Sequence, residues 1–346
     1  MYKYQIPACY YPTTVVFIDD NRKFLSALSQ RFEHIAKKGF IPIIPKFFSS
    51  AEEALKYLQD YQPDLFTVRC LHHDDPSLDH RKIDVNVPAI REEIYIPERF
   101  TQISVIVVDY AMPDLNGLEL CKKLQNKPFK KLMLTGEADE ATAVQAFNEG
   151  AIDKFIRKDI PQGFDELLLA SIRELQLQYF QDLSTIVIDS ITADPEFPNI
   201  SWLNDPAFLK LFDKLYQENE VAEYYLTDVY GSYLFLDSNA KPSWLAVKDE
   251  DGMNGTYEIG RDSDTPFPPE MLEEIKSRKK VLYLYDEGGL TDYPEEAARS
   301  LHPATKLQGK IAHYYSFIKD PNAYDINQDE ITSFNEYVKK HKTEEP

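Results

Sequence analysis

Three carboxylates, one hydroxyl and one ammonium group each follow an apolar stretch of this sequence. Asp19 and Asp20 are adjacent, Asp109 comes after a second stretch, and Thr135 and Lys158 come after two more. Carboxylates that share a pocket repel one another, and a bound divalent cation removes that cost. Ligands that are all oxygens select a hard cation, which predicts Mg²⁺ as the cofactor. A lysine and a hydroxyl beside that cation suit a group that carries oxyanions, such as a phosphoryl group.

The apolar stretches that precede these residues are typical of buried β-strands. They cover residues 13–18, 41–48, 103–108, 131–134 and 153–156. Helical patterns lie between them, and this alternation predicts an α/β fold with a doubly wound, five-stranded parallel sheet. Ligands of such sheets bind at the carboxyl ends of the strands, so the polar residues are expected to meet at one edge.

The chain divides into four predicted segments. They are an N-terminal extension (1–12), the parallel-sheet domain (13–162), a long linker or dimerisation helix (163–192) and an acidic α+β domain (193–346). An insertion at about 62–101, which contains four prolines, interrupts the first domain. Short strands are expected within it at 82–87 and 93–96.

The predicted long helix carries an apolar seam with steps of three and four residues. Its members are Leu168, Ile172, Leu175, Tyr179, Leu183 and Ile186. Such a seam is typical of a coiled coil that joins two copies of a chain. The same stripe would also form if the helix packed on its own sheet, and both interpretations stay open.

The second half of the chain is predicted to be an α+β domain with an antiparallel sheet. A helix is expected at 206–218, followed by strands at 223–226, 231–237 and 243–247. Turn residues between these strands predict a meander. A later helix is expected at 268–276, and two more strands at 281–285 and 313–318.

Two motifs in the first half resemble a known family. Asp109-Tyr110-Ala111-Met112-Pro113, with Gly117 eight residues after Asp109, resembles the D-x-x-M-P-x-x-x-G pattern of response regulator receiver domains. The segment from Gly150 to Lys158 resembles the one that ends in the lysine of that family. The resemblance covers about residues 13–175, and it implies a CheY-like, flavodoxin-like fold.

The resemblance implies a phosphoacceptor and a metal site. Asp109 would accept a phosphoryl group from a sensor histidine kinase. Asp20 and Asp109 would bind Mg²⁺ directly, Asp19 would bind it through water, and the backbone carbonyl of Ala111 would complete the shell.

The resemblance also implies a switch. Thr135 would donate to a phosphoryl oxygen, Gly136 would keep the approach open, and Lys158 would pair with the negative charge. On phosphorylation Thr135 would move, and Phe155 would turn into the space that it leaves. The readout surface would be the fourth helix, fifth strand and fifth helix of the domain, and the chain would form homodimers.

Two features depart from the family pattern. Asp159 stands where the family usually has a proline after its lysine, which puts the geometry of that loop in question. The insertion at 62–101 is unusual, and it could reshape one edge of the sheet. Taken whole, the chain resembles atypical response regulators of the Lqs α-hydroxyketone quorum-sensing system, although the second half contributes no residue motif to this likeness.

Composition and charge exclude several partners. The chain has 346 residues, of which 43 % are hydrophobic, so it can bury a sizeable core. Its net charge is −20, most of it in the second half, which argues against general nucleic-acid binding and against an anionic membrane surface. No apolar run is long enough for a membrane helix. Three widely spaced cysteines fit a reducing cytosol, so a cytoplasmic location is expected.

Two other clusters resemble metal sites less closely. Cys70, His72, His73, Asp74, Asp75, Asp79 and His80 crowd the insertion without a zinc-finger spacing, and a solvated loop explains them. Residues 325–336 follow calcium-loop spacing, but Glu330 occupies the sixth position, where that motif needs glycine.

The function of the second domain stays open. We expect it to bind a protein or a small ligand. Gly231-Ser232 with the acidic residues 249–251 faintly resembles a nucleotidyltransferase palm, which leaves a receiver-gated enzyme acting on nucleotides as an alternative. A sensory PAS-type sheet and a DNA-binding output are further alternatives, and the acidic charge argues against DNA.

Overall fold

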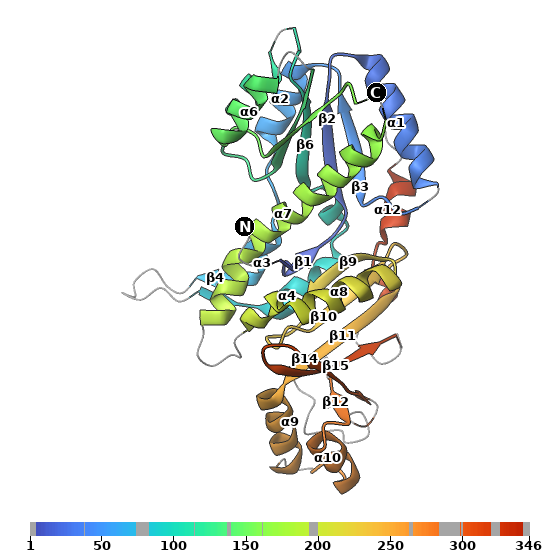
Figure 1. The fold of residues 1–346 in the computed structure, drawn as a ribbon. Helices are drawn as coiled ribbons and strands as arrows, with labels where there is room; N and C mark the ends of the chain where they lie inside the picture. Colours follow the sequence, from blue (N-terminus) through green and yellow to red (C-terminus); the bar gives the residue numbers. More distant parts are fainter. Residues whose placement is uncertain are drawn as a thin grey trace. The chain divides into compact units, whose positions relative to one another are not determined.

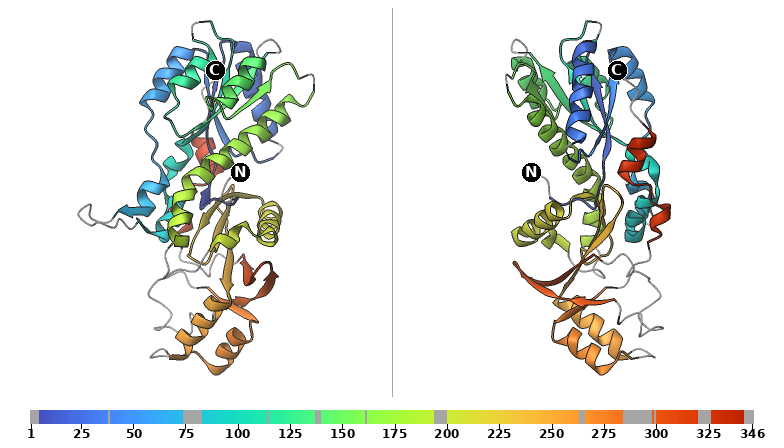
Figure 2. Two further views of the ribbon diagram at one scale, coloured as in Figure 1. Left: turned by 60° about the vertical axis from the view of Figure 1, so that its left-hand side comes forward. Right: turned by 90° about the vertical axis from the view of Figure 1, so that its right-hand side faces the viewer.

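The chain forms two compact units that alternate along the sequence (Figure 1). The computed structural model describes residues 5–37, 39–73, 83–113, 115–136, 140–160, 162–193, 200–262, 266–283, 298, 300–319 and 326–341. The parallel-sheet unit consists of Tyr11–Leu65, Pro97–Leu183 and Phe334–Pro346. The antiparallel-sheet unit consists of Met1–Tyr10, Phe66–Ile96 and Ser184–Ser333. Figure 2 gives two further views of these elements.

The parallel-sheet unit contains a five-stranded sheet in the order β3-β2-β6-β7-β8. Its strands are β2 (Thr13–Ile18), β3 (Ile43–Phe48), β6 (Ile103–Asp109), β7 (Lys130–Thr135) and β8 (Lys154–Arg157). Every neighbouring pair is parallel. The predicted doubly wound parallel sheet is therefore confirmed.

Helices cover both faces of this sheet. They are α1 (Arg22–Ala36), α2 (Ala51–Asp60), α5 (Gly117–Lys123), α6 (Glu140–Asn148) and α7 (Phe164–Ala193). Three of them begin at a side-chain cap, because Asn21, Ser50 and Asn116 accept a hydrogen bond from a backbone N–H in the first turn. Each cap fixes the residue at which the loop after a strand ends and the helix begins.

The strands supply alternate side chains to two separate cores. Val16 and Ile18 pack with residues of α2, α5 and α6. Val15 and Phe17 point to the other face, where they pack with residues of α1 and α7. Because both faces are covered, residues 15–18 of β2 and 105–108 of β6 are continuous apolar runs, as the sequence pattern indicated.

The first half of the apolar seam on α7 packs on the sheet of its own unit, which is the second of the two interpretations given above. Leu168, Ile172 and Leu175 are almost fully buried within the core that α7 shares with α1. Farther along the helix, Ile186 is 42 % exposed. Residues 184–193 of α7 belong to the antiparallel-sheet unit.

Most of the insertion that the structure describes is helical. It contains α3 (Phe66–Cys70), β4 (Leu71–His73), β5 (Ile83–Val85), α4 (Val87–Arg91) and the 3₁₀ turn η1 (Glu92–Tyr95), and the two strands pair with each other. The strand expected at 82–87 is present as β5. The strand expected at 93–96 is wrong, because the Ile96 N–H donates to the Glu93 carbonyl in a 3₁₀ turn and a buried ion pair with Arg69 holds the Glu93 side chain.

The antiparallel-sheet unit contains a six-stranded sheet in the order β1-β9-β10-β11-β15-β14. The strands are β1 (Cys9–Tyr10), β9 (Val221–Leu226), β10 (Tyr233–Asp237), β11 (Pro242–Asp249), β14 (Thr305–Gln308) and β15 (Ala312–Ile318). A two-stranded sheet joins β12 (Lys280–Leu282) to β13 (Leu301–Pro303). The predicted meander is confirmed, since β9, β10 and β11 pair antiparallel in that order.

Short helices complete both units. In the antiparallel-sheet unit they are η4 (Ile200–Asn204), α8 (Pro206–Glu218), α9 (Glu250–Asp262), α10 (Pro269–Lys276) and η6 (Gln328–Glu330). The parallel-sheet unit adds η2 (Pro97–Thr101) and α12 (Phe334–Lys340), and α12 packs Phe334 and Tyr337 against Phe100. The sequence pattern does not indicate β1, β13, β14, α9 or α12.

Candidate functional site

The loop after β2 carries the first two carboxylates. The Asp19 N–H donates to the carbonyl of Phe48 at 3.1 Å, which ties the end of β2 to the end of β3. The Asp19 carboxylate in turn accepts the N–H of Asn21 at 2.9 Å. This turn leaves Asp20 exposed, and its side chain makes no hydrogen bond or ion pair with the described residues.

Asp109 is the last residue of β6, and a glycine lies against its backbone. A Cβ on Gly117 would lie only 2.2 Å from the carbonyl oxygen of Asp109. The Gly117 N–H donates to the Tyr110 carbonyl at 3.0 Å. The eight-residue spacing between the aspartate and the glycine therefore has a steric cause, because a side chain at 117 would force α5 away from this loop.

The three carboxylates meet at one edge of the sheet. Oxygens of Asp19, Asp20 and Asp109 all lie within 4.8 Å of one another. Asp19 and Asp109 are buried, with exposed fractions of 1 % and 7 %. Oxygens at this spacing fit a hard divalent cation. Within the described ranges this is the one group of three or more His, Cys, Asp or Glu side chains placed to hold a metal.

Lys158 lies beside two of these carboxylates. Its ammonium nitrogen is 2.5 Å from Asp19 Oδ2 and 2.9 Å from Asp109 Oδ1. Burial raises the pKa of the Asp19 carboxyl, and the bond from Lys158 offsets part of that rise. One lysine thus faces two buried carboxylates, and a cation would supply the positive charge that this edge still lacks.

Thr135 ends β7 next to the same residues. Its carbonyl accepts the backbone N–H of Lys158 at 2.9 Å. Its hydroxyl oxygen is fully buried and has no hydrogen-bond partner in the part of the chain that the structure describes. A buried hydroxyl without a partner is rare, so it is available to a group that enters the pocket.

Three other predicted residues lie on or just after the strands of the sheet. Ala111 is exposed two residues after Asp109, and Gly136 follows Thr135 directly. Phe155 lies on β8, half-buried against the core that contains α5 and α6.

The loop after Lys158 contains the departure from the family pattern. The exposed Asp159 carboxylate accepts two hydrogen bonds from the Arg157 guanidinium, at 2.9 and 2.6 Å. This contact lowers the pKa of the Asp159 carboxyl. The negative charge of Asp159, which follows Lys158 in the sequence, is therefore paired with the Arg157 guanidinium.

Sequence reasoning missed Phe24. The Lys158 ammonium lies 4.9 Å from the centroid of the Phe24 ring. The signal available in the sequence was an aromatic residue in the first turn of the helix that follows Asp20.

The weaker clusters do not form sites within the described residues. Cys70 ends α3 and is fully buried, His72 and His73 lie on β4, and the remaining residues of that cluster lie outside the described residues. Asp325 also lies outside them. The Asn327 side chain donates to the Glu330 carboxylate at 2.6 Å, and Glu336 belongs to α12.

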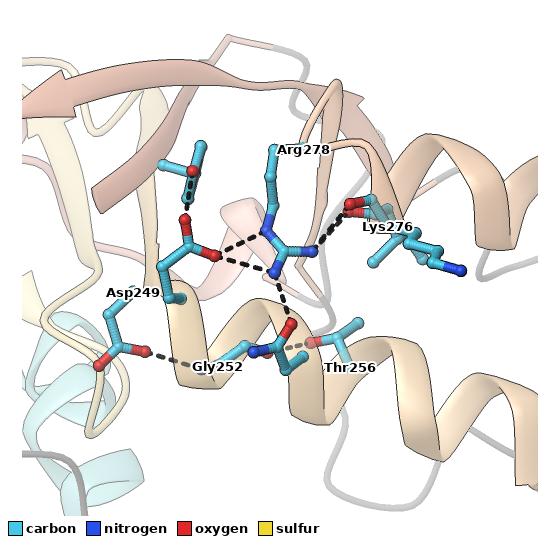
Figure 3. A network of polar contacts seen from close by, with 9 residues as sticks. Asp249, Gly252, Thr256, Lys276 and Arg278 are labelled. Carbon is cyan, nitrogen blue, oxygen red and sulfur yellow. Dashed lines mark hydrogen bonds and ion pairs between the residues drawn. The ribbon is translucent and has the colours of Figure 1, made fainter. Parts of the chain in front are cut away.

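The acidic residues after β11 serve the start of α9 (Figure 3). Asp249 accepts the N–H of Gly252 at 2.7 Å, as a helix cap does. Glu250 accepts hydrogen bonds from Arg278 at 2.9 Å and from Tyr314 at 2.5 Å. Of the residues that resembled a nucleotidyltransferase palm, Asp249 therefore caps α9 and Glu250 joins α9 to its neighbours.

The sheet order, the helices on both faces and three carboxylates beside a lysine define a receiver-type signalling domain. Residues 78–170 match the family described as response regulator receiver domain. Over its whole length the chain is similar to the Legionella pneumophila response regulator LqsR, with 31 % identity, 100 % of this chain and 99 % of that chain covered, and a TM-score of 0.80. The chain therefore belongs to the response regulator family.

Two curated relatives match a shorter region. Response regulator RppA of Synechocystis sp. is 34 % identical over 84 residues, which are 24 % of this chain and 34 % of RppA. Transcriptional regulatory protein FixJ of Bradyrhizobium diazoefficiens is 44 % identical over 55 residues, which are 15 % of this chain and 26 % of FixJ. The chain thus spans about a third or less of the length of these two proteins. Among the described residues, no helix has both the length and the apolar character that crossing a bilayer requires.

Proposed function

We propose that Asp109 accepts a phosphoryl group from a cognate sensor histidine kinase, the partner that a receiver domain implies. The observation that carries this proposal is the cluster of Asp19, Asp20 and Asp109 oxygens within 4.8 Å, with the Lys158 ammonium 2.9 Å from Asp109. An Asp109 oxygen attacks the phosphorus of a phosphohistidine. A P–O bond forms, the P–N bond breaks, and the leaving imidazole keeps the electron pair.

The cofactor of this transfer is Mg²⁺. We assign Asp20 and Asp109 as direct ligands, Asp19 as a ligand through water, and the Ala111 carbonyl as a further ligand. Bound there, the cation offsets the negative charge of the carboxylates and of the phosphoryl oxygens. The all-oxygen donor set supports this choice of ion.

Lys158 and Thr135 act on the phosphoryl group itself. The Lys158 ammonium neutralises charge that develops on the phosphoryl oxygens. The Thr135 hydroxyl, which has no partner among the described residues, donates to one of those oxygens. Gly136 leaves room for the incoming group.

Phosphorylation then changes the surface of the receiver. When Thr135 moves toward the phosphoryl group, the Phe155 ring turns into the space beside it. Val144 and Phe147 on α6 are 42 % and 50 % exposed, and Leu167 on α7 is 40 % exposed. These apolar side chains support homodimer formation through this face, and residues 164–190 remain the second candidate for the dimer contact.

The antiparallel-sheet unit is proposed as an output domain that binds a protein or a small ligand, not DNA. Its acidic composition supports this, since phosphate contacts need basic side chains. The whole-chain likeness to LqsR supports a place in quorum-sensing signalling. All three cysteines are unpaired and buried, which supports a cytoplasmic location. A nucleotide-dependent enzyme remains the alternative, and turnover that depends on Asp249 or Asp251 would favour it.

The acceptor assignment is tested with radiolabelled acetyl phosphate. The wild-type chain with Mg²⁺ is expected to become labelled, and EDTA is expected to abolish the label. Asp109→Asn should remove the label altogether, since no nucleophilic carboxylate remains at that position. Label that survives this substitution would refute the assignment.

Asp159→Asn is the matched control. It removes a carboxylate next to Lys158 that contacts Arg157 at 2.6 Å. We expect labelling of this variant to equal that of the wild type. A loss equal to that of Asp109→Asn would show that the assay measures charge near Lys158 and not the acceptor.

A further inference from the structure

We infer that Phe24 is a positioning residue that holds the Lys158 ammonium in the phosphoacceptor pocket. The inference rests on the proposed function, because it concerns how that lysine reaches the reacting group. It is carried by a contact between α1 and the loop after β8, in which an ammonium lies over an aromatic ring.

The ammonium has three close neighbours. Lys158 Nζ lies 2.5 Å from Asp19, 2.9 Å from Asp109 and 4.9 Å from the centroid of the Phe24 ring. An ammonium within about 6 Å of a ring centroid is attracted to the negative face of the ring. The Lys158 side chain is 25 % exposed, so the ring also limits the solvent that reaches it.

The Phe24 ring is itself held in place by the loop that carries the carboxylates. The Asn21 side chain caps α1 and accepts the N–H of Phe24 at 3.2 Å. Asp19 accepts the N–H of Asn21. The ring also meets Phe164 edge to face, with centroids 6.2 Å apart at 65°. The position of Phe24 is therefore fixed from both sides, by the Asp19 turn and by the first residue of α7.

An aromatic ring holds the Lys158 ammonium in the pocket better than a third carboxylate would. An ammonium has three N–H donors, and two of them point to Asp19 and Asp109 here. Attraction to a ring face places no competing acceptor beside the ammonium. When Asp109 becomes an acyl phosphate and loses its own charge, the ring still holds the ammonium near the phosphoryl oxygens. A lysine on a flexible four-carbon stem would otherwise sample rotamers that leave the pocket.

The first measurement is geometric and needs no phosphoryl donor. Lysine labelled with ¹³C at the ε-carbon is followed by NMR in the full chain, and Lys158→Arg assigns the signal. The ring face is expected to shift the Lys158 ε-CH₂ protons upfield. Phe24→Leu, which keeps an apolar side chain, should return them to the position of ordinary lysines, and Phe24→Tyr should keep the shift.

The second measurement separates cation–π attraction from packing. Phenylalanine with one, two or three ring fluorines at position 24 loses negative charge from the ring face with little change of shape. The labelling rate constant at saturating acetyl phosphate should fall with each fluorine. The Phe24→Leu rate should be lower by roughly three- to tenfold, while the half-saturating acetyl phosphate concentration stays nearly unchanged.

Phe32→Leu is the matched control. Phe32 lies on the same helix and in the same core as Phe24, and its ring contacts Phe17 at 5.3 Å. This variant is expected to lower stability without moving the Lys158 signal or the labelling rate. Lys158 signals at the ordinary position in the wild type, or equal rates across the fluorinated series, would overturn the inference.

The two proposals fail in different ways. If Asp109 were not the acceptor, the wild-type chain would not be labelled, yet the Lys158 signal would still report the ring contact. If the chain is labelled on Asp109 but the fluorinated variants label as fast as the wild type, only the role of Phe24 is lost.

Discussion

Acidic side chains are used differently in the two units of this molecule. In the antiparallel-sheet unit they accept backbone N–H groups close by. Asp205 accepts from Ala207 and Lys310, and Asp228 accepts from Tyr230 and Ser232. At the edge of the parallel sheet, Asp20 has no such partner among the described residues, and the contact that the structure gives the Asp109 side chain is with Lys158.

The difference separates carboxylates that hold a fold from carboxylates that are left for chemistry. A side chain that caps a helix or closes a turn has its lone pairs occupied, and its removal is felt as lost stability. Carboxylates that crowd together without such donors cost stability, and they are kept for what they can bind. Three experiments can break or sharpen this comparison.

The largest effect is expected from Lys158→Met. Removing one positive donor from a pocket where charge develops lowers a rate by roughly 10²- to 10³-fold. Labelling by acetyl phosphate should therefore fall by about this factor. Lys154→Met, at the start of β8, removes an ion pair to Glu174 outside the pocket and should leave labelling unchanged. Equal losses in the two variants would mean that positive charge near the end of the sheet, and not the position of Lys158, governs the reaction.

A smaller effect is expected from a single methyl group at two glycines. Gly117→Ala places a Cβ 2.2 Å from the Asp109 carbonyl oxygen, and such overpacking costs roughly 1–3 kcal/mol. Gly255→Ala, on α9, has open space around it and should gain about 0.5–1 kcal/mol. Urea unfolding followed by circular dichroism measures both. A Gly117→Ala chain of unchanged stability would contradict the steric account of the Asp109–Gly117 spacing.

The smallest effect is expected from acidification of the antiparallel-sheet unit. His313 is buried, its ring lies 3.9 Å from that of Trp202 between centroids, tilted by 32°, and its Nε2 has no partner among the described residues. Burial lowers the pKa of His313 below its ordinary value of 6.5. Between the two pKa values the unfolded chain binds more protons, so stability is complete above pH 6.5 and falls as the pH drops toward the folded-state pKa.

Tryptophan fluorescence can follow this change in one unit alone. The chain has two tryptophans, Trp202 and Trp244, and both lie in the antiparallel-sheet unit. The urea midpoint read from this fluorescence should drop between pH 7 and pH 5, and His313→Gln should flatten that drop. A wild-type midpoint that does not change over this range would show that folding does not lower the pKa of His313.

The parallel sheet and its site could be predicted because local pattern and tertiary structure agree there. Strands buried on both faces are apolar throughout, and the chain has to turn polar where they end, so Asp19, Asp109 and Thr135 stand out. Gly117 was found through the family pattern, and the structure supplies its reason, since the close approach to Asp109 leaves no room for a side chain.

The rest could not be predicted because tertiary contacts override local preference. Helix α9 contains three glycines in 13 residues, a composition that predicts a loop. A Cβ on Gly252 would meet the ring of Tyr230 at 2.8 Å, and one on Gly260 would meet Phe267 at 2.3 Å. Those glycines leave room for aromatic rings that lie outside α9. Phe24 was overlooked in the same way, because its role depends on a lysine 134 positions later in the sequence.

The alternation of the two units along the chain limits how this regulator can be taken apart. The polypeptide passes between them near residues 10, 65, 96, 183 and 333. No single cut releases either unit whole, and a fragment that begins near 190 would lack the edge strand β1 and the helices of 66–96. Recombination therefore cannot exchange the antiparallel-sheet unit for another by one crossover, as it can in regulators whose modules follow one another. The two units have to be inherited, and to diverge, together.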